Sequence, residues 1–468
     1  MNSQKRATKK RALQKMELLG STSIPKALLA MGIPTMVGML VNAFYNLVDA
    51  YFVGGLGESQ MGAISVVYPL GQVIVGLGLL FGNGAASYIS RLLGRGDKEN
   101  ADKVASTALY SSVSVGAVII IISMVFLHPI LKLLGATDSI LPFAATYAGI
   151  YIVSCIFNVF NVTMNNIVTS EGAAKTTMCA LLTGAVLNIA LDPLFIYVFD
   201  LGVAGAAIAT AISQIVSTCV YLTYIFRKKS VFHFRVKDCT YTKETMSEIF
   251  KIGIPTLVFQ ILTSVSISLI NNAAGDYGDS AIAGMGVVTR LISMGSLSLF
   301  GFIKGFQPIA GYSYGAKKFD RLREAIKTSI LWSTVFCVIF GVILALFPTA
   351  IVSRFTKGDV WMIRIGAASL RANGISIMLF GFYTVYSSLF LALGKGREGF
   401  ILGACRQGIC FIPVILLLPM VWGLNGIMYA QPIADVLSAV ITVFMAIPLH
   451  RELNEMQRHI ATISTDKN

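Results

Sequence analysis

The chain has 468 residues, of which 55% are hydrophobic and 13% are charged, and its mean hydropathy is +0.73. This composition is too apolar and too poor in charge for a water-soluble protein of this length. The formal net charge of +14 would point to nucleic acid in a soluble protein, but in a membrane protein basic residues often record topology instead. The positions of the basic residues along the chain therefore have to distinguish nucleic-acid binding from membrane topology.

Hydropathy predicts twelve membrane-spanning helices, because apolar windows of about 20 residues recur along the chain. The predicted spans are residues 26–54, 61–92, 103–127, 138–166, 176–199, 202–226, 247–275, 281–313, 322–347, 360–392, 398–420 and 424–448. Of the 37 Lys and Arg residues, 30 lie in or near the tails and loops of one side, 4 in or near the loops of the other side, and 3 deeper within the spans. The positive-inside rule then predicts a multi-pass protein of the plasma or inner membrane with both termini in the cytoplasm, and no nucleic-acid partner.

The first predicted element is a basic cytoplasmic tail, residues 1–25, which lacks the short apolar segment and cleavage site of a removable signal peptide. Next comes an N-terminal lobe of six helices, residues 26–226. A polar, basic linker at 227–246 joins it to a C-terminal lobe of six helices at 247–448, and a second cytoplasmic tail covers 449–468.

The first span carries polar residues on one helical face. Asn42, Tyr45, Asn46 and Asp49 are spaced at i, i+3, i+4 and i+7, which places them together on an α-helix. Pro34 lies near the cytoplasmic start of the same span and removes one backbone hydrogen bond. It is a candidate hinge, although a static kink is an equally simple interpretation.

Spans four and five add two further polar faces. In span five, Asn188 precedes Asp192 by one turn. In span four, six polar residues follow one another at steps of three or four: Tyr147, Tyr151, Ser154, Asn158, Asn161 and Asn165. A face of this kind is not stable against lipid, so it is expected to line the bundle interior or water. The asparagines could equally hydrogen-bond to one another and hold helices together.

Asp49 and Asp192 are the clearest functional candidates in this lobe. An ionisable residue inside the bilayer costs roughly 2.5–3.5 kcal/mol on insertion scales, so it needs a partner or a function. A buried carboxyl group responds to its surroundings by exchanging a proton or a bound cation. The sequence alone leaves a coupling role and a structural role open for each acid.

The two halves of the chain are related at a constant offset of 221 residues. Gly32-Ile33-Pro34-Thr35 recurs as Gly253-Ile254-Pro255-Thr256. Other matching residues are Phe81, Gly84 and Gly94 with Phe302, Gly305 and Gly315, and Gly202 and Gly205 with Gly423 and Gly426. Because each half has six spans, the halves enter from the same face and are related by an axis along the membrane normal. Such halves can rock about a central cavity, with Pro255 as a second candidate hinge.

The acids are not part of this repeat. The offset places Ile270 opposite Asp49 and Pro413 opposite Asp192. The second lobe has its own intramembrane acid, Asp435, together with four bases in or near its spans: Arg290, Lys304, Arg371 and Arg406. A buried ion pair between Asp435 and one of these bases is favoured over a substrate or proton role.

No motif for soluble catalysis is present in the sequence. It contains no phosphate-binding Gly-x-x-x-x-Gly-Lys-Ser/Thr loop. Its four histidines and seven cysteines are scattered without the spacing of a metal site. We therefore expect a secondary transporter without a cofactor or a resident metal, and not an enzyme.

The chain resembles the multidrug and toxic compound extrusion (MATE) family over nearly its whole length. The resemblance is carried by residues 40–49 (LVNAFYNLVD), 52–54 (FVG) and 188–196 (NIALDPLFI). Within the family it is similar to the MepA-type and DinF-type exporters. The resemblance implies a V-shaped fold of two six-helix lobes and drug/cation antiport by alternating access. It also implies that Asp49 and Asp192 form an acidic pair with Tyr45, Tyr147, Asn188 and Thr210 as neighbours.

The expected function is thus export of small organic cations, coupled to H⁺ or to Na⁺ ligated at Asp49 and Asp192, by a monomer embedded in lipid. Other branches of the family have acids in spans seven and ten. Here span ten has Arg371 instead, which favours coupling through the first lobe. The alternative is a flippase for a lipid-linked or phosphate-bearing substrate, for which Arg290, Lys304 and Arg371 would supply positive charge.

Overall fold

A computed structural model describes residues 2–56, 58–134, 136–356 and 359–465. These residues are almost entirely helical and contain no strand. Twelve of the helices are long and apolar enough to cross a membrane. Each of them overlaps one predicted span, so the predicted all-helical, twelve-span architecture is confirmed.

The first lobe begins after a helix at the N-terminus, α1 (Asn2–Gly20). Its elements are α2 (Ile24–Gly54), α3 (Glu58–Arg95), α4 (Lys98–Val125), the short α5 (Leu127–Leu133), α6 (Leu141–Ser170), α7 (Ala174–Pro193) with the π-helix η1 (Leu194–Val198), and α8 (Gly202–Phe226). A 3-10 turn, η2 (Val236–Asp238), lies between the lobes.

The second lobe repeats this order. Its elements are α9 (Lys243–Gly275), α10 (Asp279–Gly315), α11 (Phe319–Leu346), the short α12 (Pro348–Val352) with η3 (Ser353–Phe355), α13 (Val360–Ser376) with η4 (Ile377–Leu379) and α14 (Phe380–Ala392), α15 (Gly396–Ala404) with the π-helix η5 (Cys405–Ile409) and α16 (Phe411–Trp422), and α17 (Leu424–Thr465).

The helices extend beyond the predicted lobe boundaries. Helix α9 begins at Lys243 rather than at residue 247, because the side chain of Thr242 caps its first turn by accepting a hydrogen bond from the Thr245 N–H group. Helix α17 runs on to Thr465 through the sequence expected to be a tail. The first tail likewise contains helix α1, whose sequence is rich in the strong helix formers Lys, Arg, Leu and Gln.

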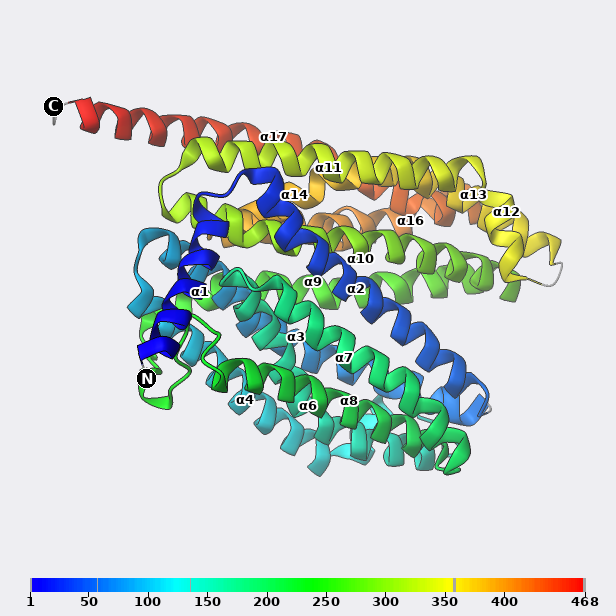
Figure 1. Ribbon diagram of the computed structural model, residues 1–468. Helices are drawn as coiled ribbons and strands as arrows, with labels where there is room; N and C mark the ends of the chain where they lie inside the picture. Colours follow the sequence, from blue (N-terminus) through cyan, green and yellow to red (C-terminus); the bar gives the residue numbers. More distant parts are fainter. Residues whose placement is uncertain (1, 57, 135, 357–358, 466–468) are drawn as a thin grey trace.

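The two lobes lie one above the other in Figure 1, and both chain termini lie at the same end of the helices. We call this end the terminal face and the other end the opposite face. Helix α2 connects the lobes, since it packs against α10 and α11 of the second lobe and against α7 of the first. Towards the opposite face the two bundles diverge.

Glycines allow the lobes to meet backbone to backbone near the terminal face. A Cβ atom on Gly84 of α3 would lie 2.2 Å from the Ile249 carbonyl oxygen of α9, and one on Gly253 of α9 would lie 2.1 Å from the Leu80 carbonyl oxygen of α3. The repeat provides the same contact between α10 and α2, where a Cβ atom on Gly305 would lie 2.5 Å from the Gly32 nitrogen. Helix backbones approach this closely only where no side chain intervenes. The repeat therefore produces two related seams, α3 with α9 and α10 with α2, that close the terminal face.

Candidate functional site

Two carboxyl groups meet inside the first lobe, one on α2 and one on α7. Asp192 is fully buried, and Asp49 is partly buried and close enough to interact with it directly. The amide of Asn188, one turn before Asp192 on α7, donates a 3.2 Å hydrogen bond to Asp192 Oδ1. The i, i+4 spacing on one helix thus produces the contact that was expected from the sequence.

The acid pair has no basic partner in the part of the chain that the structure describes. Among the described residues, no Lys, Arg or His forms an ion pair with either acid. One oxygen of each carboxyl group, Asp49 Oδ1 and Asp192 Oδ2, is buried and has no hydrogen-bond partner among the described residues. Two unscreened carboxylates at such a short distance repel each other, so a proton or a cation between them would be strongly stabilised.

Tyrosines surround the pair. Tyr45 of α2 and Tyr147 of α6 both lie within the electrostatic reach of Asp49 and Asp192. Tyr147 stacks on Tyr151 with ring centroids 5.4 Å apart and an interplanar angle of 14°. Gly71 of α3 leaves room for this stack, since a Cβ atom there would lie 2.6 Å from the Tyr151 hydroxyl oxygen. The predicted neighbours Tyr45, Tyr147 and Asn188 are thus brought to the acid pair.

The other predicted residues of α6 divide into two kinds. Asn161 holds α6 to α8, because its amide donates to the Gln214 side chain at 2.9 Å and its carbonyl accepts from the Thr218 hydroxyl at 2.9 Å. Asn158, one turn away, has a buried carbonyl oxygen without a hydrogen bond among the described residues. Asn161 therefore serves as a contact between helices, whereas Asn158 keeps an unused acceptor.

The remaining candidates of the first lobe form no hydrogen bond to the pair among the described residues. Asn46 is exposed and donates to Asn42 Oδ1 at 2.9 Å on its own helix. Thr210 is partly buried on α8, and no hydrogen bond of the described residues joins it to either acid. Pro34 and Pro255 both lie inside unbroken helices, α2 and α9, at the two seams.

The second lobe holds its acid differently. Asp435 of α17 accepts hydrogen bonds from Arg406 Nε at 2.8 Å, the Ser376 hydroxyl at 2.9 Å and the Gln431 amide at 2.9 Å. Both members of the ion pair are buried, and the guanidinium group lies 4.2 Å from the centre of the Phe380 ring. Of the other three bases, Arg290 and Arg371 are exposed on α10 and α13, while Lys304 reaches across to the first lobe and donates to Asn165 Oδ1.

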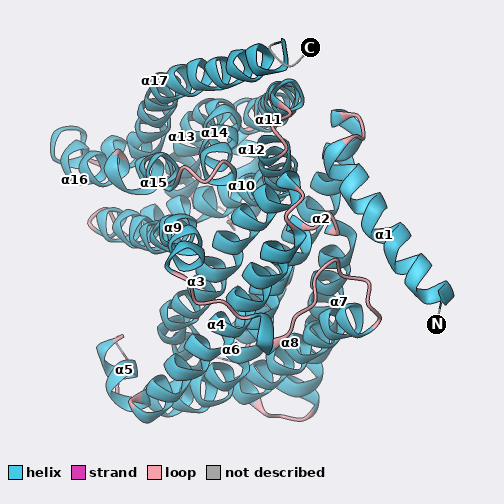
Figure 2. Ribbon diagram, turned by 90° about the vertical axis from the view of Figure 1, so that its left-hand side faces the viewer, coloured by secondary structure: helices cyan, strands magenta, loops and turns pink. Residues whose placement is uncertain are grey.

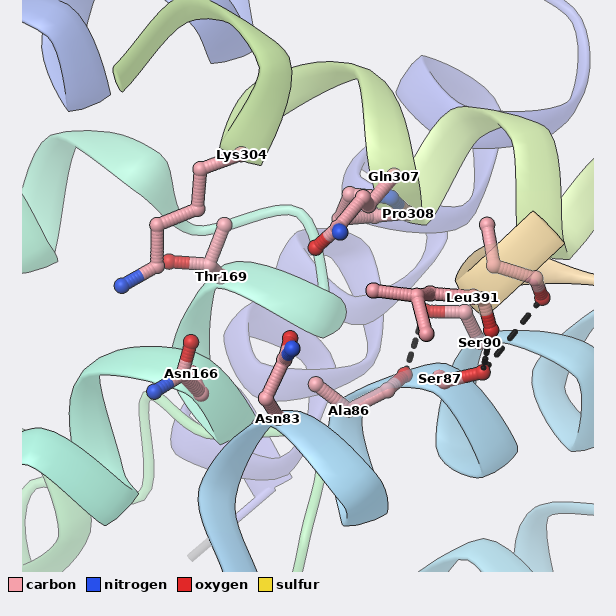
Figure 3. A pocket seen from close by; sticks show the side chains of 11 residues that line it. Asn83, Ala86, Ser87, Ser90, Asn166, Thr169, Lys304, Gln307, Pro308 and Leu391 are labelled. Atoms are coloured by element: carbon pink, nitrogen blue, oxygen red, sulfur yellow. Dashed lines mark hydrogen bonds between the residues drawn. The ribbon is translucent and has the colours of Figure 1, made fainter. Parts of the chain in front are cut away.

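A small pocket lined mainly by polar residues lies between the lobes near the terminal face and is separate from the acid pair. Figure 3 shows α3 and α6 of the first lobe on one side of it and α10 of the second on the other. Two of its lining residues, Asn83 and Lys304, occupy matching positions of the 221-residue repeat. Asn83 donates to the Thr256 hydroxyl of α9 at 2.8 Å, so both residues form hydrogen bonds between the lobes.

The sequence interpretation missed two ion pairs near the terminal face. Arg91 of α3 bonds to Glu248 of α9 at 2.6 Å, and Lys15 of α1 bonds to the fully buried Glu171 at 3.1 Å. Their partners are 157 and 156 residues apart in the chain. The only signal in the sequence was Glu171 itself, an acid at the end of an apolar span.

Comparison with known proteins agrees with this architecture. A family model described as MatE matches residues 34–194 and again residues 255–417, once in each lobe. The Multidrug export protein MepA of Staphylococcus aureus (strain MRSA252) is 32% identical over 416 residues, which cover 89% of this chain and 92% of that protein. The protein of the same name from Staphylococcus saprophyticus is 32% identical over 420 residues, 90% of this chain and 92% of its own.

Solved structures match over almost the whole chain. The structure described as "Crystal structure of MATE in complex with MaL6" superimposes with a TM-score of 0.89 at 26% identity and covers 95% of this chain and 99% of that one. The structure described as "Outward-facing conformation of a multidrug resistance MATE family transporter of the MOP superfamily" has a TM-score of 0.88 at 26% identity, with 94% and 98% covered. The protein is therefore a member of the MatE family of multi-pass membrane transporters.

Proposed function

We propose that this protein is an ion-coupled exporter of small organic cations, with Asp49 and Asp192 as the coupling groups. The relatives named above are described as multidrug exporters and multidrug resistance transporters, which supports export of chemically diverse small molecules. The acid pair supports the rest of the proposal. Negative charge inside an apolar lobe attracts organic cations and coupling ions alike.

The observation that carries the proposal is the pair of adjoining carboxyl groups without a basic partner. A structural acid in a bilayer protein is normally neutralised by a base, as Asp435 is by Arg406. Among the described residues, the pair accepts a hydrogen bond from Asn188, and each acid keeps one buried oxygen without a partner. Their charge is therefore available to a ligand that comes and goes.

Transport would follow from competition for this charge. A cationic substrate enters from the terminal face and is held while the pair is ionised. A proton or Na⁺ ion arriving from the opposite face neutralises the pair, weakens the attraction for the substrate and favours its release on that side. A bound ion shifts the equilibrium between two conformations only if it binds one of them more tightly than the other. The proposal therefore requires that the acid pair is more accessible from the opposite face in one conformation than in the other.

Alternating access fits the seams. The lobes touch along glycine contacts near the terminal face and diverge towards the opposite face (Figure 1). These contacts support a conformation that is closed at the terminal face, and in the proposed cycle its counterpart is closed at the opposite face. The excess of Lys and Arg near the terminal face supports a cytoplasmic position for that face, so the opposite face would lie outside the cell.

The test is efflux of a cationic dye from proteoliposomes under an imposed pH gradient and, separately, under an imposed Na⁺ gradient. Asp49→Asn and Asp192→Asn should each reduce efflux at least tenfold without loss of folded protein. Asp200→Asn is the matched control, because Asp200 is an exposed acid of the same lobe with φ of 53°, a conformation that Asn tolerates well. Undiminished efflux in both pair variants would contradict the proposal, and the gradient that drives the parent protein identifies the ion.

A further inference from the structure

Two basic side chains lie where the lobes meet near the terminal face, Arg91 of α3 and Lys304 of α10. Figure 2 looks onto this face and shows α3 and α10 at the centre of the molecule, between the two bundles. Arg91 is paired with Glu248 of α9 at 2.6 Å. Lys304 forms no ion pair with the described residues, and its hydrogen bond goes to the neutral side chain of Asn165. Within the described part of the chain, the charge of Lys304 is therefore not balanced by an acid.

The pocket beside Lys304 is polar, but no Asp or Glu is among the described residues that line it. Its polar lining residues are Asn83, Ser87, Ser90, Asn166, Thr169, Lys304 and Gln307. Figure 3 shows Lys304 extending from α10 towards Thr169 and Asn166 of α6. Amide and hydroxyl oxygens can accept hydrogen bonds from an ammonium group, but they leave its net charge in place. The matching position of the repeat holds the neutral Asn83, so the repeated scaffold does not require a base here.

Lys304 lies between the terminal face and the acid pair. It comes 11 residues before the end of α10 at Gly315, which corresponds to about 16 Å along the helix. Asp49 comes 25 residues after the start of α2 at Ile24, about 38 Å along its helix from the same face. A substrate that enters from the terminal face therefore passes the level of Lys304 before it reaches the acid pair.

Opening of the terminal face would change the surroundings of Lys304. Its partner Asn165 belongs to α6 of the first lobe, so separating the lobes breaks their hydrogen bond and leaves the amine beside the entry path. In contact with water, a lysine side chain is fully charged at neutral pH. Arg91 and Glu248 also belong to different lobes, but their opposite charges enter the path together and largely cancel. Lys304 adds a positive charge without such a counterpart.

We propose that Lys304 is a charge filter on the entry path, which favours singly charged organic cations over dications. The proposal rests on the function proposed above and narrows its substrate class. The acid pair attracts a dication more strongly than a monocation, because Coulomb energy is proportional to the charge of the substrate. For the same reason, Lys304 repels a dication twice as strongly. Lys304 is thus a specificity-determining residue that acts before the coupling groups are reached.

Two probes of matched shape test the filter. The linear isomers of N-methyl-phenylpyridinium and N,N′-dimethyl-bipyridinium share a biaryl framework, and they carry one and two positive charges. The readout is the rate of uptake of the dication into everted membrane vesicles, divided by that of the monocation, both at low concentration. Such a ratio cancels differences in expression and folding. Lys304→Met should raise it about threefold to tenfold, the effect of one charge a few ångströms away in a watery path.

Lys304→Arg is the matched control, because it changes the side chain and keeps the charge. Its ratio should stay within about twofold of the parent value. An unchanged ratio in Lys304→Met would overturn the filter, as would an equal rise in Lys304→Arg. If the parent protein transports neither probe, the result counts against the proposed function instead.

A second variant tests the same charge from the first lobe if Lys304→Met fails to fold. Asn165→Asp keeps the shape of the side chain and places a carboxylate beside the ammonium group. Tyr221, whose hydroxyl accepts from Asn165 Nδ2 at 3.1 Å, can donate its own proton to the new carboxylate. The charge of Lys304 is then balanced, so the ratio should again rise about threefold or more. Asn165→Ala removes the hydrogen bond without adding charge and should leave the ratio at the parent value. Equal ratios for the two Asn165 variants would overturn the proposal.

Discussion

The two lobes share a scaffold but hold their buried acids in opposite ways. In the second lobe, Asp435 accepts hydrogen bonds from three side chains, one of them the buried guanidinium group of Arg406. In the first lobe, Asp49 and Asp192 adjoin each other and Asn188 donates to Asp192, while each acid has one oxygen without a partner among the described residues. The duplication thus preserved helix packing while the chemistry inside each lobe diverged.

From this difference we propose that Asp435 is structural and that Asp49 and Asp192 are not. An acid with a complete set of donors and a buried base is already neutralised, and removing either partner exposes the other to an apolar surrounding. An acid without such partners is costly to keep, and it persists where it has a function. The first lobe would then do the coupling, while the second would be a rigid body that moves against it.

The largest effect on stability is expected from the second lobe. Asp435→Asn leaves Arg406 buried and unpaired, which should lower the free energy of unfolding by about 3–5 kcal/mol. Thermal unfolding in detergent, followed by size-exclusion chromatography, would measure the loss. Asp49→Asn should leave the melting temperature within the scatter of the parent protein, since it removes no ion pair.

The double variant Asp435→Asn/Arg406→Gln sharpens this contrast. Removing both charges should recover much of the stability and keep dye efflux within about threefold of the parent, because a neutral pair can replace a buried ion pair at little cost. Loss of efflux in a stable double variant would show that the second lobe takes part in coupling, and the comparison between the lobes would fail.

An intermediate loss of stability is expected from substitutions at the two seams between the lobes. Gly253→Ala places a methyl group 2.1 Å from the Leu80 backbone oxygen, whereas Gly32→Ala, at the matching position of the repeat, meets the Phe302 ring at 2.6 Å. A ring can rotate and a helix backbone cannot, so Gly253→Ala should cost about 1–3 kcal/mol of stability and Gly32→Ala less. Gly403→Ala is the control, because nothing lies within 4 Å of a Cβ atom there. Equal melting temperatures for Gly253→Ala and Gly403→Ala would show that the α3–α9 seam is not tightly packed.

Much of the fold could be predicted from the sequence because its signals are local or periodic. Apolar windows gave the spans, and the 221-residue offset gave the paired lobes, which the family model matches twice. The i, i+4 spacing of Asn188 and Asp192 predicted their contact on one helix. Helix ends were less predictable, since α9 begins at a side-chain cap and α17 continues past the predicted span in a polar sequence.

Contacts between distant segments could not be predicted in this way. Asn161 lies on the same polar face of α6 as Asn158, yet its amide donates a hydrogen bond to Gln214 on α8, whereas the Asn158 carbonyl has no partner among the described residues. The spacing of the two residues does not distinguish them. Lys15 looked like one more basic residue of a polar tail, and its partner Glu171 is 156 residues away. Such pairs depend on how helices cross, which hydropathy and periodicity do not specify.

The smallest effect tests the single hydrogen bond of the acid pair. Asn188→Ala removes the amide that donates to Asp192 Oδ1. A hydrogen bond to a charged group contributes about 1.5–3 kcal/mol, but the adjoining carboxyl group and water can take over part of this role. Dye efflux should therefore fall about tenfold or less, without the full loss expected for Asp192→Asn. Thr177→Val is the matched control on the same helix, because the hydrogen bond of the Thr177 hydroxyl among the described residues goes to the Ala174 carbonyl of its own turn. If the Asn188→Ala and Thr177→Val variants transport dye equally well, transport does not depend on the hydrogen bond from Asn188 to Asp192. The difference in hydrogen bonding between Asp192 and Asp435 would then affect the stability of the lobes and not transport.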